Sequence, residues 1–450
     1  MPRYEFKEGS SNKFWEITKD ETKVTTRWGR IGTEGQEKVQ TFKFTYEANT
    51  AYDKLVLEKE KKGYTRMKPE DTGPKPKSNP ELEAAILRAP ESPDGYLVYG
   101  DWLQSQGDPR GEFIALQHAQ LQATGAEATA LKRKVANVLK KHEGFLVGTA
   151  LASSLKDKTL SVEWHLGFIR SARLAVGDYD EHPELELDET LKLLLKHPSA
   201  RFLQELVIGL ADNDGENHYG NLIRHIAKNA PKTLQKVFLG DYVFPDDTEI
   251  SWTDVGSVTP LCEALPQLRS LRLRGGGVSL GKIDLPELRE FILESGGLGR
   301  PSVKAINAAK WPKLERLEVW FGSENYGAGG SEKDLQNILD AKDLPELKHL
   351  GLCNAEFTAQ LCVLLPKSRV LKQLETLDLS KGTMTDADAA VLAANADAFK
   401  HLKRLDVTRN LLTTKGTKLI AKLCPDVAHG NQRRDRSDGE DGERYVAVGE

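Results

Sequence analysis

The stretch LETLDLSKGTMTDADAAVLA, residues 374–393, joins a strand pattern to a helix pattern in one unit. Leucines at alternate positions, such as Leu377 and Leu379, predict a short strand that buries one face. The following residues, 385–399, predict a helix that covers the same core. Because one such unit cannot bury its own apolar face, we expect neighbouring units to stack into a solenoid.

The strand part of this unit, LxxLxL with aliphatic substitutions, recurs along the second half of the chain. Its copies begin at positions 203, 234, 268, 288, 314, 347, 374 and 402. Repetition at this spacing is typical of repeat proteins. We therefore predict an α/β solenoid over residues 176–428.

The rest of the chain divides into segments of different composition. Residues 1–67 hold four stretches of alternating apolar and polar residues and then an amphipathic helix pattern, which predicts a small α+β domain. Residues 68–79 are rich in Pro, Lys and Gly and predict an extended linker. Residues 80–175 begin with repeated capping-residue–Pro signals and predict a small helical domain. A charged tail, 429–450, contains YVAV, which suggests one more strand.

The overall composition is that of an ordinary soluble protein, with 39% hydrophobic and 29% charged residues. No apolar run approaches the roughly 20 residues of a membrane helix. The first ten residues lack the apolar core of a signal peptide. We therefore expect a cytoplasmic protein with no membrane partner.

The four cysteines, at positions 262, 353, 362 and 424, are scattered and lack the spacing of zinc ligands. We predict that they are reduced core residues, and we predict no metal and no cofactor. The charge is uneven along the chain. Residues 1–79 hold 17 Lys and Arg against 13 Asp and Glu, a net +4, whereas the whole chain has a net charge of -4. A basic head on an acidic body is compatible with nucleic-acid binding by the head.

Two segments after the head resemble known families. The repeats resemble leucine-rich repeats of the ribonuclease-inhibitor type, and residues 374–393 carry the nearest likeness. That resemblance implies a horseshoe-shaped solenoid with no stated ligand. Residues 97–117, LVYGDWLQSQGDPRGEFIALQ, and 165–170, HLGFIR, resemble a small bacterial companion domain found before such repeats. This second resemblance implies architecture only.

The head resembles the WGR domain through KFWEI at 13–17, TRWGRIGTEGQ at 26–36 and AYDKLVLEKEKKGYT at 51–65. The best-understood members of that family belong to poly(ADP-ribose) polymerases, where the domain binds DNA at a strand break. There the motif tryptophan packs on a terminal sugar and the arginine makes polar contacts. Nothing after residue 80 resembles the other domains of those polymerases, so the resemblance does not extend to their activity.

The motif makes Trp28 and Arg30 candidate nucleic-acid-binding residues. Period 2 along a strand places both on one face, provided that the strand continues through Gly29. An indole stacks on a sugar or base, and a guanidinium offers a planar fork to phosphate oxygens. In the alternative interpretation, Trp28 is a core anchor and Arg30 an ordinary surface residue.

Gln36 and Lys38 follow in what the sequence predicts to be a glycine turn. We include them as candidate phosphate contacts, and the alternative is that they belong to a solvated loop.

We found no phosphate-loop, nucleophilic-serine or zinc-helix motif, and we therefore predict no catalytic residue. Our leading hypothesis is a non-enzymatic adaptor whose head binds nucleic acid at DNA ends while the repeats bind a protein. The alternative is a pure protein-interaction scaffold, in which the head also docks on protein. Nucleic-acid binding weakens steeply with salt, so salt dependence separates the two.

Overall fold

The computed structural model describes residues 2–8, 11–67, 76–177, 185–212, 217–434 and 444–449. The chain forms two compact units. The first comprises Met1–Ser78, Gly100–Ser161 and Gly177–Leu194, and the second comprises Asn79–Tyr99, Val162–Val176 and Leu195–Glu450. Most of the predicted linker, residues 68–75, lies outside the described residues.

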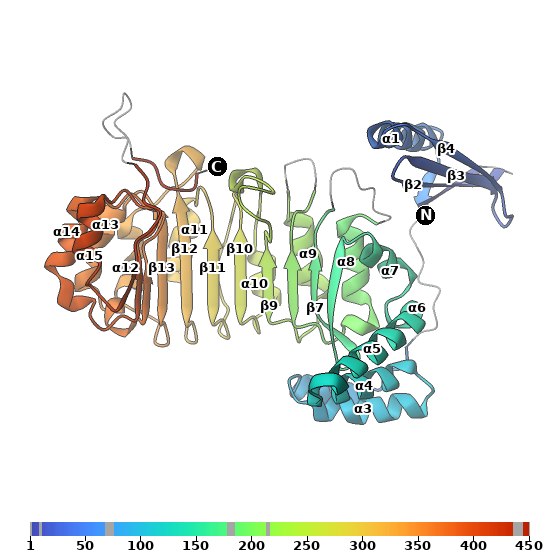
Figure 1. Cartoon of the computed structure of the whole chain (residues 1–450), viewed down its shortest axis with the longest axis horizontal. Coiled ribbons are helices and arrows are strands. Elements are labelled where there is room, and N and C mark those ends of the chain that lie inside the picture. Colours follow the sequence, from blue (N-terminus) through green and yellow to red (C-terminus); the bar gives the residue numbers. More distant parts are fainter. Residues whose placement is uncertain are drawn as a thin grey trace. The chain divides into compact units, whose positions relative to one another are not determined.

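The head is a five-stranded antiparallel sheet with one helix (Figure 1). Its elements are β1 (Arg3–Glu8), β2 (Ser11–Asp20), β3 (Lys23–Arg30), β4 (Gln36–Thr41), α1 (Thr45–Lys61) and β5 (Thr65–Met67). The alternating patterns predicted the first four strands, and the amphipathic pattern predicted the helix. Helix α1 ends where Gly63, at φ 81, donates its N–H to the carbonyl of Glu60. The short strand β5 has no recognisable alternation and was missed.

Buried side chains from the sheet and α1 form the core of the head. They are Tyr4, Trp15, Ile17, Val24, Ala48 and Tyr52. Trp15, Ile17 and Val24 come from adjacent strands, and Ala48 and Tyr52 lie one helical turn apart on α1. The amphipathic pattern of α1 thus covers one face of the sheet.

Helices follow from Pro80 onward, as the sequence predicted. They are α2 (Pro80–Arg88), α3 (Pro93–Ser105), α4 (Pro109–Gln122), α5 (Gly125–Lys141), α6 (Glu143–Leu146), α7 (Thr149–Lys156) and α8 (Leu187–Lys196). The Asn79 side chain accepts hydrogen bonds from the N–H groups of Glu81 and Leu82. Asp108 accepts one from Arg110. These two caps account for the start of α2 and α4.

The second unit is built on an eleven-stranded sheet that keeps chain order from β6 to β16. Its strands are β6 (Leu160–His165), β7 (Phe168–Leu174), β8 (Glu205–Ile208), β9 (Lys236–Leu239), β10 (Ser270–Arg274), β11 (Glu290–Glu294), β12 (Arg316–Gly322), β13 (His349–Ala355), β14 (Thr376–Asp378), β15 (Arg404–Asp406) and β16 (Asp426–Ala428). From β7 to β16 all neighbours pair in parallel. Each of the eight LxxLxL copies overlaps one of these strands, from β8 to β15.

The register of these strands places equivalent residues in rows. One row runs through Leu206, Val237, Leu271, Phe291, Leu317, Leu350, Leu377 and Leu405. Every member is buried. The stacking of repeats therefore creates the continuous core that no single repeat provides.

From β7 onward helices connect most successive strands, with the exception of β10 and β11, and Figure 1 shows α9–α11 behind the sheet. They are α9 (Gly220–Asn229), α10 (Thr259–Ala264), α11 (Arg300–Ala308), α12 (Gln336–Leu339), α13 (Thr358–Leu364), α14 (Asp386–Ala394) and α15 (Thr414–Ile420). Parallel strands joined through helices give the second unit a solenoid-like fold. The horseshoe curvature and the domain bounds 80–175 and 176–428 stay predictions. The YVAV segment forms no strand, and this expectation was wrong.

Candidate nucleic-acid interface

Strand β3 continues through Gly29 to Arg30, which was the condition for placing Trp28 and Arg30 together. In the β2–β3 hairpin, Trp28 lies opposite Trp15 and Arg30 lies opposite Lys13. Directly opposed residues share a face of the sheet, and residues two apart along a strand do as well. The hairpin therefore brings an indole and two cations to the same face.

Trp28 is half-buried and packs against the core cluster of the head. Trp28 also lines a surface pocket of about 570 Å³. The two interpretations of this residue are thus compatible, because the same residue packs on the core and borders the pocket.

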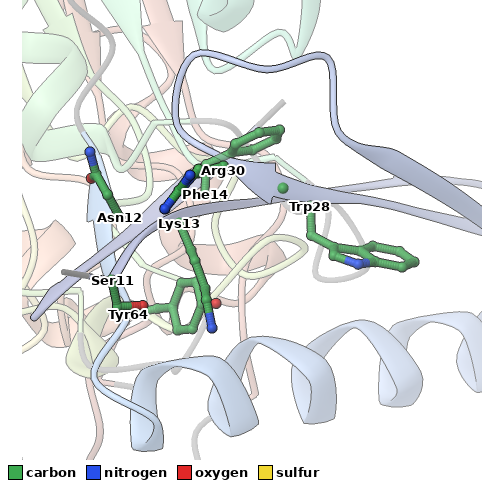
Figure 2. A pocket seen from close by; sticks show the side chains of 8 residues that line it. Ser11, Asn12, Lys13, Phe14, Trp28, Arg30 and Tyr64 are labelled. Carbon is green, nitrogen blue, oxygen red and sulfur yellow. The ribbon is translucent and has the colours of Figure 1, made fainter.

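The pocket lies where the β2–β3 hairpin approaches the end of α1 (Figure 2). Its lining residues are Ser11, Asn12, Lys13, Phe14, Trp28, Gly29, Arg30 and Tyr64. Two of them are cationic, two carry polar side chains, three are aromatic and none is acidic. Figure 2 shows the Trp28 indole and the Lys13 side chain on the side of the sheet where the helix runs. Such a lining suits a ligand with both a flat ring and a negative charge.

The arginines of the neighbouring strands are already paired. Glu16 accepts hydrogen bonds from Arg3 at 3.1 Å and from Arg27 at 2.8 Å. Arg30 is exposed and forms no ion pair within the described residues, and the same holds for Lys13. Both cations that line the pocket are therefore available to an anion.

A third cation, Lys59 of α1, lies beside the pocket wall. Its Nζ is 4.9 Å from the ring centroid of Tyr64 and 5.3 Å from that of Trp15. Burial lowers the pKa of Lys59, and the charges of Lys62 and Lys13 lower it further. This mutual repulsion among cations would be relieved by a bound anion.

The missing side chain of Gly29 makes room for the backbone of the loop that follows β3. A Cβ atom there would lie 2.8 Å from Gly35 Cα and 3.1 Å from the Phe14 ring. Gly35 has φ 77, and a Cβ on it would lie 2.6 Å from Phe14. The loop after β3 thus folds back over Phe14, and the two glycines allow that close approach.

Gln36 and Lys38 do not lie in the glycine turn, because strand β4 already begins at Gln36. Gln36 pairs with Trp28 and Lys38 pairs with Thr26. Both side chains are exposed, and neither lines the pocket. Thr26 lies four residues from Arg30, about 13 Å along a strand, which separates Lys38 from the pocket cations.

Lys13, Lys59 and Tyr64 were missed by the sequence reasoning. Lys13 could have been found from the hairpin register, because the turn at Glu21 and Thr22 places it opposite Arg30. The approach of Lys59 and Tyr64 depends on how α1 packs on the sheet, and no local pattern reports that packing.

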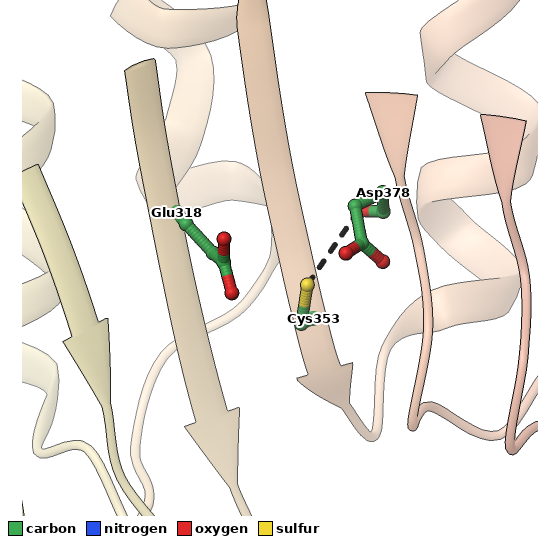
Figure 3. A group of neighbouring side chains, drawn as sticks. All are labelled: Glu318, Cys353 and Asp378. Carbon is green, nitrogen blue, oxygen red and sulfur yellow. Dashed lines mark hydrogen bonds between the residues drawn. The ribbon is translucent and has the colours of Figure 1, made fainter. Parts of the chain in front are cut away.

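A second cluster lies in the repeats, where Glu318, Cys353 and Asp378 come from adjacent strands (Figure 3). One ligand atom from each lies within 4.8 Å of the others. The Glu318 oxygens accept from the Trp320 indole N–H at 3.0 Å and from Arg316 at 2.5 Å. Burial raises the pKa of the Cys353 thiol well above its usual range. A protonated thiol and a carboxylate already bonded to protein donors account for this cluster without an ion.

All four cysteines are buried and free, as the sequence predicted. Within the described residues, no helix has the length and apolar character needed to cross a bilayer.

Fold and site together define a class of protein in which a small head with a cationic pocket precedes a solenoid-like sheet. Comparison with known families shows that residues 3–71 match the WGR domain family, so the chain carries a WGR domain at its head. A search of curated proteins found no match. The resemblance of residues 97–117 and 165–170 to a companion domain stays a prediction.

Solved structures are similar to this chain over different lengths. A crystal structure of a protein from Bacteroides fragilis is 24% identical, covers 100% of this chain and 99% of its own, and has a TM-score of 0.53. This likeness shows a shared fold and nothing about function. An internalin from Listeria monocytogenes is 14% identical over 65% of this chain and 97% of its own, with a TM-score of 0.27. That value is too low to support an argument.

Proposed function

We propose that this protein is a non-enzymatic adaptor whose WGR head binds nucleic acid at a DNA end while its leucine-rich repeats bind a protein. The observation that carries the proposal is the pocket in which Trp28, Arg30 and Lys13 meet without a carboxylate. The match to a family of nucleic-acid-binding domains supports it. In this interpretation the indole stacks on the terminal sugar or base, and Arg30 and Lys13 contact phosphate oxygens.

The test uses the full chain and a 5′-phosphorylated duplex, with binding followed by fluorescence anisotropy. The same duplex closed by hairpin loops at both ends serves as the ligand without a terminus. We expect the open duplex to bind at least about tenfold more tightly. Trp28→Ala should cost about 1–3 kcal/mol of binding free energy, the usual value of one stacked base.

Arg30→Ala and Lys13→Ala should each weaken binding and reduce the salt slope by about one. Lys23→Ala is the matched control, because Lys23 is exposed on the same strand, seven residues or about 23 Å from Arg30. Equal affinity of wild type and Trp28→Ala for the open duplex would refute the proposal.

The alternative is a protein-interaction scaffold without nucleic-acid binding. The packing of Trp28 on the core of the head favours it, since that ring already has a structural role. It predicts no salt-dependent affinity for either duplex.

A further inference from the structure

Residues near the end of the chain lie on the large sheet, although they form no strand. The Val448 side chain is buried against Ile250, Trp320 and Cys353. Trp320 and Cys353 alternate with the leucine row of β12 and β13, so they lie on the opposite face of the sheet. A single aliphatic side chain thus fills an apolar pocket on that face.

The backbone around Val448 is held by three hydrogen bonds. The Asn354 side-chain amide donates to the Val448 carbonyl at 2.6 Å, and its oxygen accepts from the Val448 N–H at 3.0 Å. The Ala447 N–H donates to the Lys381 carbonyl at 2.8 Å. These three hydrogen bonds are made to backbone atoms of the segment, so peptides of many other sequences would form them as well.

Asn354 differs from the other buried asparagine of the neighbouring repeats. Asn410 donates to the carbonyls of Leu379 and Val407 and so joins adjacent repeats. The side-chain bonds of Asn354 instead both go to Val448. The Asn354 side chain therefore holds the docked segment, while its backbone N–H donates to the Ser380 carbonyl of the next repeat.

The docked segment reaches its pocket from the same copy of the chain. Arg433 donates to the Tyr445 carbonyl at 2.7 Å, which brings the two sides of the intervening residues together. The same guanidinium donates to the carbonyls of Gly382 and Arg409 in the repeats. A segment tethered this closely has a high effective concentration at the pocket.

We propose that Asn354, the Lys381 carbonyl and the pocket of Ile250, Trp320 and Cys353 form a binding site for an extended peptide with a valine-sized side chain. Residues Ala447 and Val448 occupy this site as an internal competitor. The inference rests on the protein-binding half of the proposed function and names its ligand class. An external peptide binds tightly only when the segment is released, because it must otherwise compete with an intramolecular ligand.

The probe is a fluorescein-labelled peptide with the sequence of residues 444–449, RYVAVG, added to the full chain. Val448→Asp in the chain places a charge in the apolar pocket and should release the segment. We expect the peptide to bind this variant at least tenfold more tightly than it binds wild type. A peptide with Asp at the Val448 position should not bind either protein.

Asn354→Gly, combined with Val448→Asp, should weaken peptide binding at least tenfold. Glycine suits this position because Asn354 has φ 55. Asn431→Gly is the matched control, since Asn431 has φ 53 and is exposed.

If Val448→Asp unfolds at a lower temperature than wild type, as measured by circular dichroism, Val448→Thr replaces it, because threonine keeps the shape of valine and adds only a hydroxyl.

Equal peptide binding by wild type and the released variant would overturn the inference, as would no binding by a natively folded released variant. No effect of Asn354→Gly would also overturn it. Light scattering checks the occupant: a wild-type dimer that Val448→Asp dissociates would show that the segment docks on a second copy. DNA-end binding should be unchanged in all these variants. A failure of the peptide-site proposal is therefore distinguishable from a failure of the proposal that the WGR head binds DNA ends.

Discussion

At the scale of single residues, the head depends on side chains whose roles overlap. Trp28 serves the core and the pocket together, whereas Arg30 is exposed and forms no ion pair within the described residues. Gly29 and Gly35 let the following loop cross Phe14. The pocket geometry therefore depends on these two glycines as well as on the aromatic and cationic side chains that line the pocket.

Gly35→Ala should destabilise the head. Its new Cβ would meet Phe14 at 2.6 Å and the Trp28 carbonyl at 2.7 Å, at a φ of 77. We expect a loss of about 2–4 kcal/mol in the opening free energy of β3, from left-handed strain and overpacking together. Hydrogen exchange of the β3 amides measures it.

Gly32→Ala is the control for this substitution. It has φ 91, but its Cβ would meet nothing within 4 Å. Gly32→Ala should lower the opening free energy only through left-handed backbone strain, by about 1–2 kcal/mol. Equal losses in the two variants would show that the Phe14 contact is unimportant.

Glu318 should make the stability of the repeats sensitive to acid. Burial alone would raise its pKa, but His349, Trp320 and Arg316 hold the pKa at about 2, below the ordinary 4.5. A lowered folded-state pKa stabilises the fold above about pH 4.5, and the contribution is lost as the pH falls toward 2. The full contribution is on the order of 3 kcal/mol.

Glu318→Gln should remove this part of the pH dependence. Urea unfolding of both proteins at pH 7 and pH 3 measures it. Wild type should lose more stability than the variant between these values. An identical loss in both proteins would contradict the assignment to Glu318.

At the scale of elements, helix starts and strand rows follow directly from local sequence. A capping side chain followed by proline begins α2 and α4, and alternating aliphatic residues form the strands of the large sheet. Each of these signals lies within a few consecutive residues, as a capping side chain before a proline or as an alternation of aliphatic residues. That is why a single sequence predicts them.

Asn79→Ala should cost about 1 kcal/mol of stability through the loss of the cap of α2. Asn79→Asp keeps an oxygen acceptor for the N–H groups of Glu81 and Leu82 and should cost little. Thermal unfolding measures both variants. Equal losses would mean that the cap oxygen does not stabilise the helix.

Leu377→Ala should cost about 2–5 kcal/mol, because Leu377 is fully buried between Leu350 and Leu405 of the leucine row. Nearest-neighbour coupling predicts faster hydrogen exchange in β13 and β15 as well. Leu419→Ala makes the same chemical change at an exposed position and should have little effect. A purely local effect of Leu377→Ala would argue against coupling between repeats.

At the scale of the whole molecule, residues 1–79 and the rest of the chain carry opposite net charge. Residues 1–79 have a net charge of +4 and the whole chain has -4, which leaves -8 for the remainder. An acidic remainder repels a polyanion, so electrostatic attraction to DNA would be confined to the head. This distribution fits an adaptor in which each part has its own ligand.

The sequence by itself determined the repeated strands and helices, the helix caps and the placement of Trp28 and Arg30 on one strand, because each follows from periodicity or from bonds between near neighbours. Its placement of Lys38 and Gln36 in a glycine turn was wrong, since strand β4 already begins at Gln36. The tertiary structure alone decided that Tyr64 borders the pocket and that Val448 fills a site at Asn354. Those contacts join residues far apart in the chain, and only the packing of whole elements brings them together.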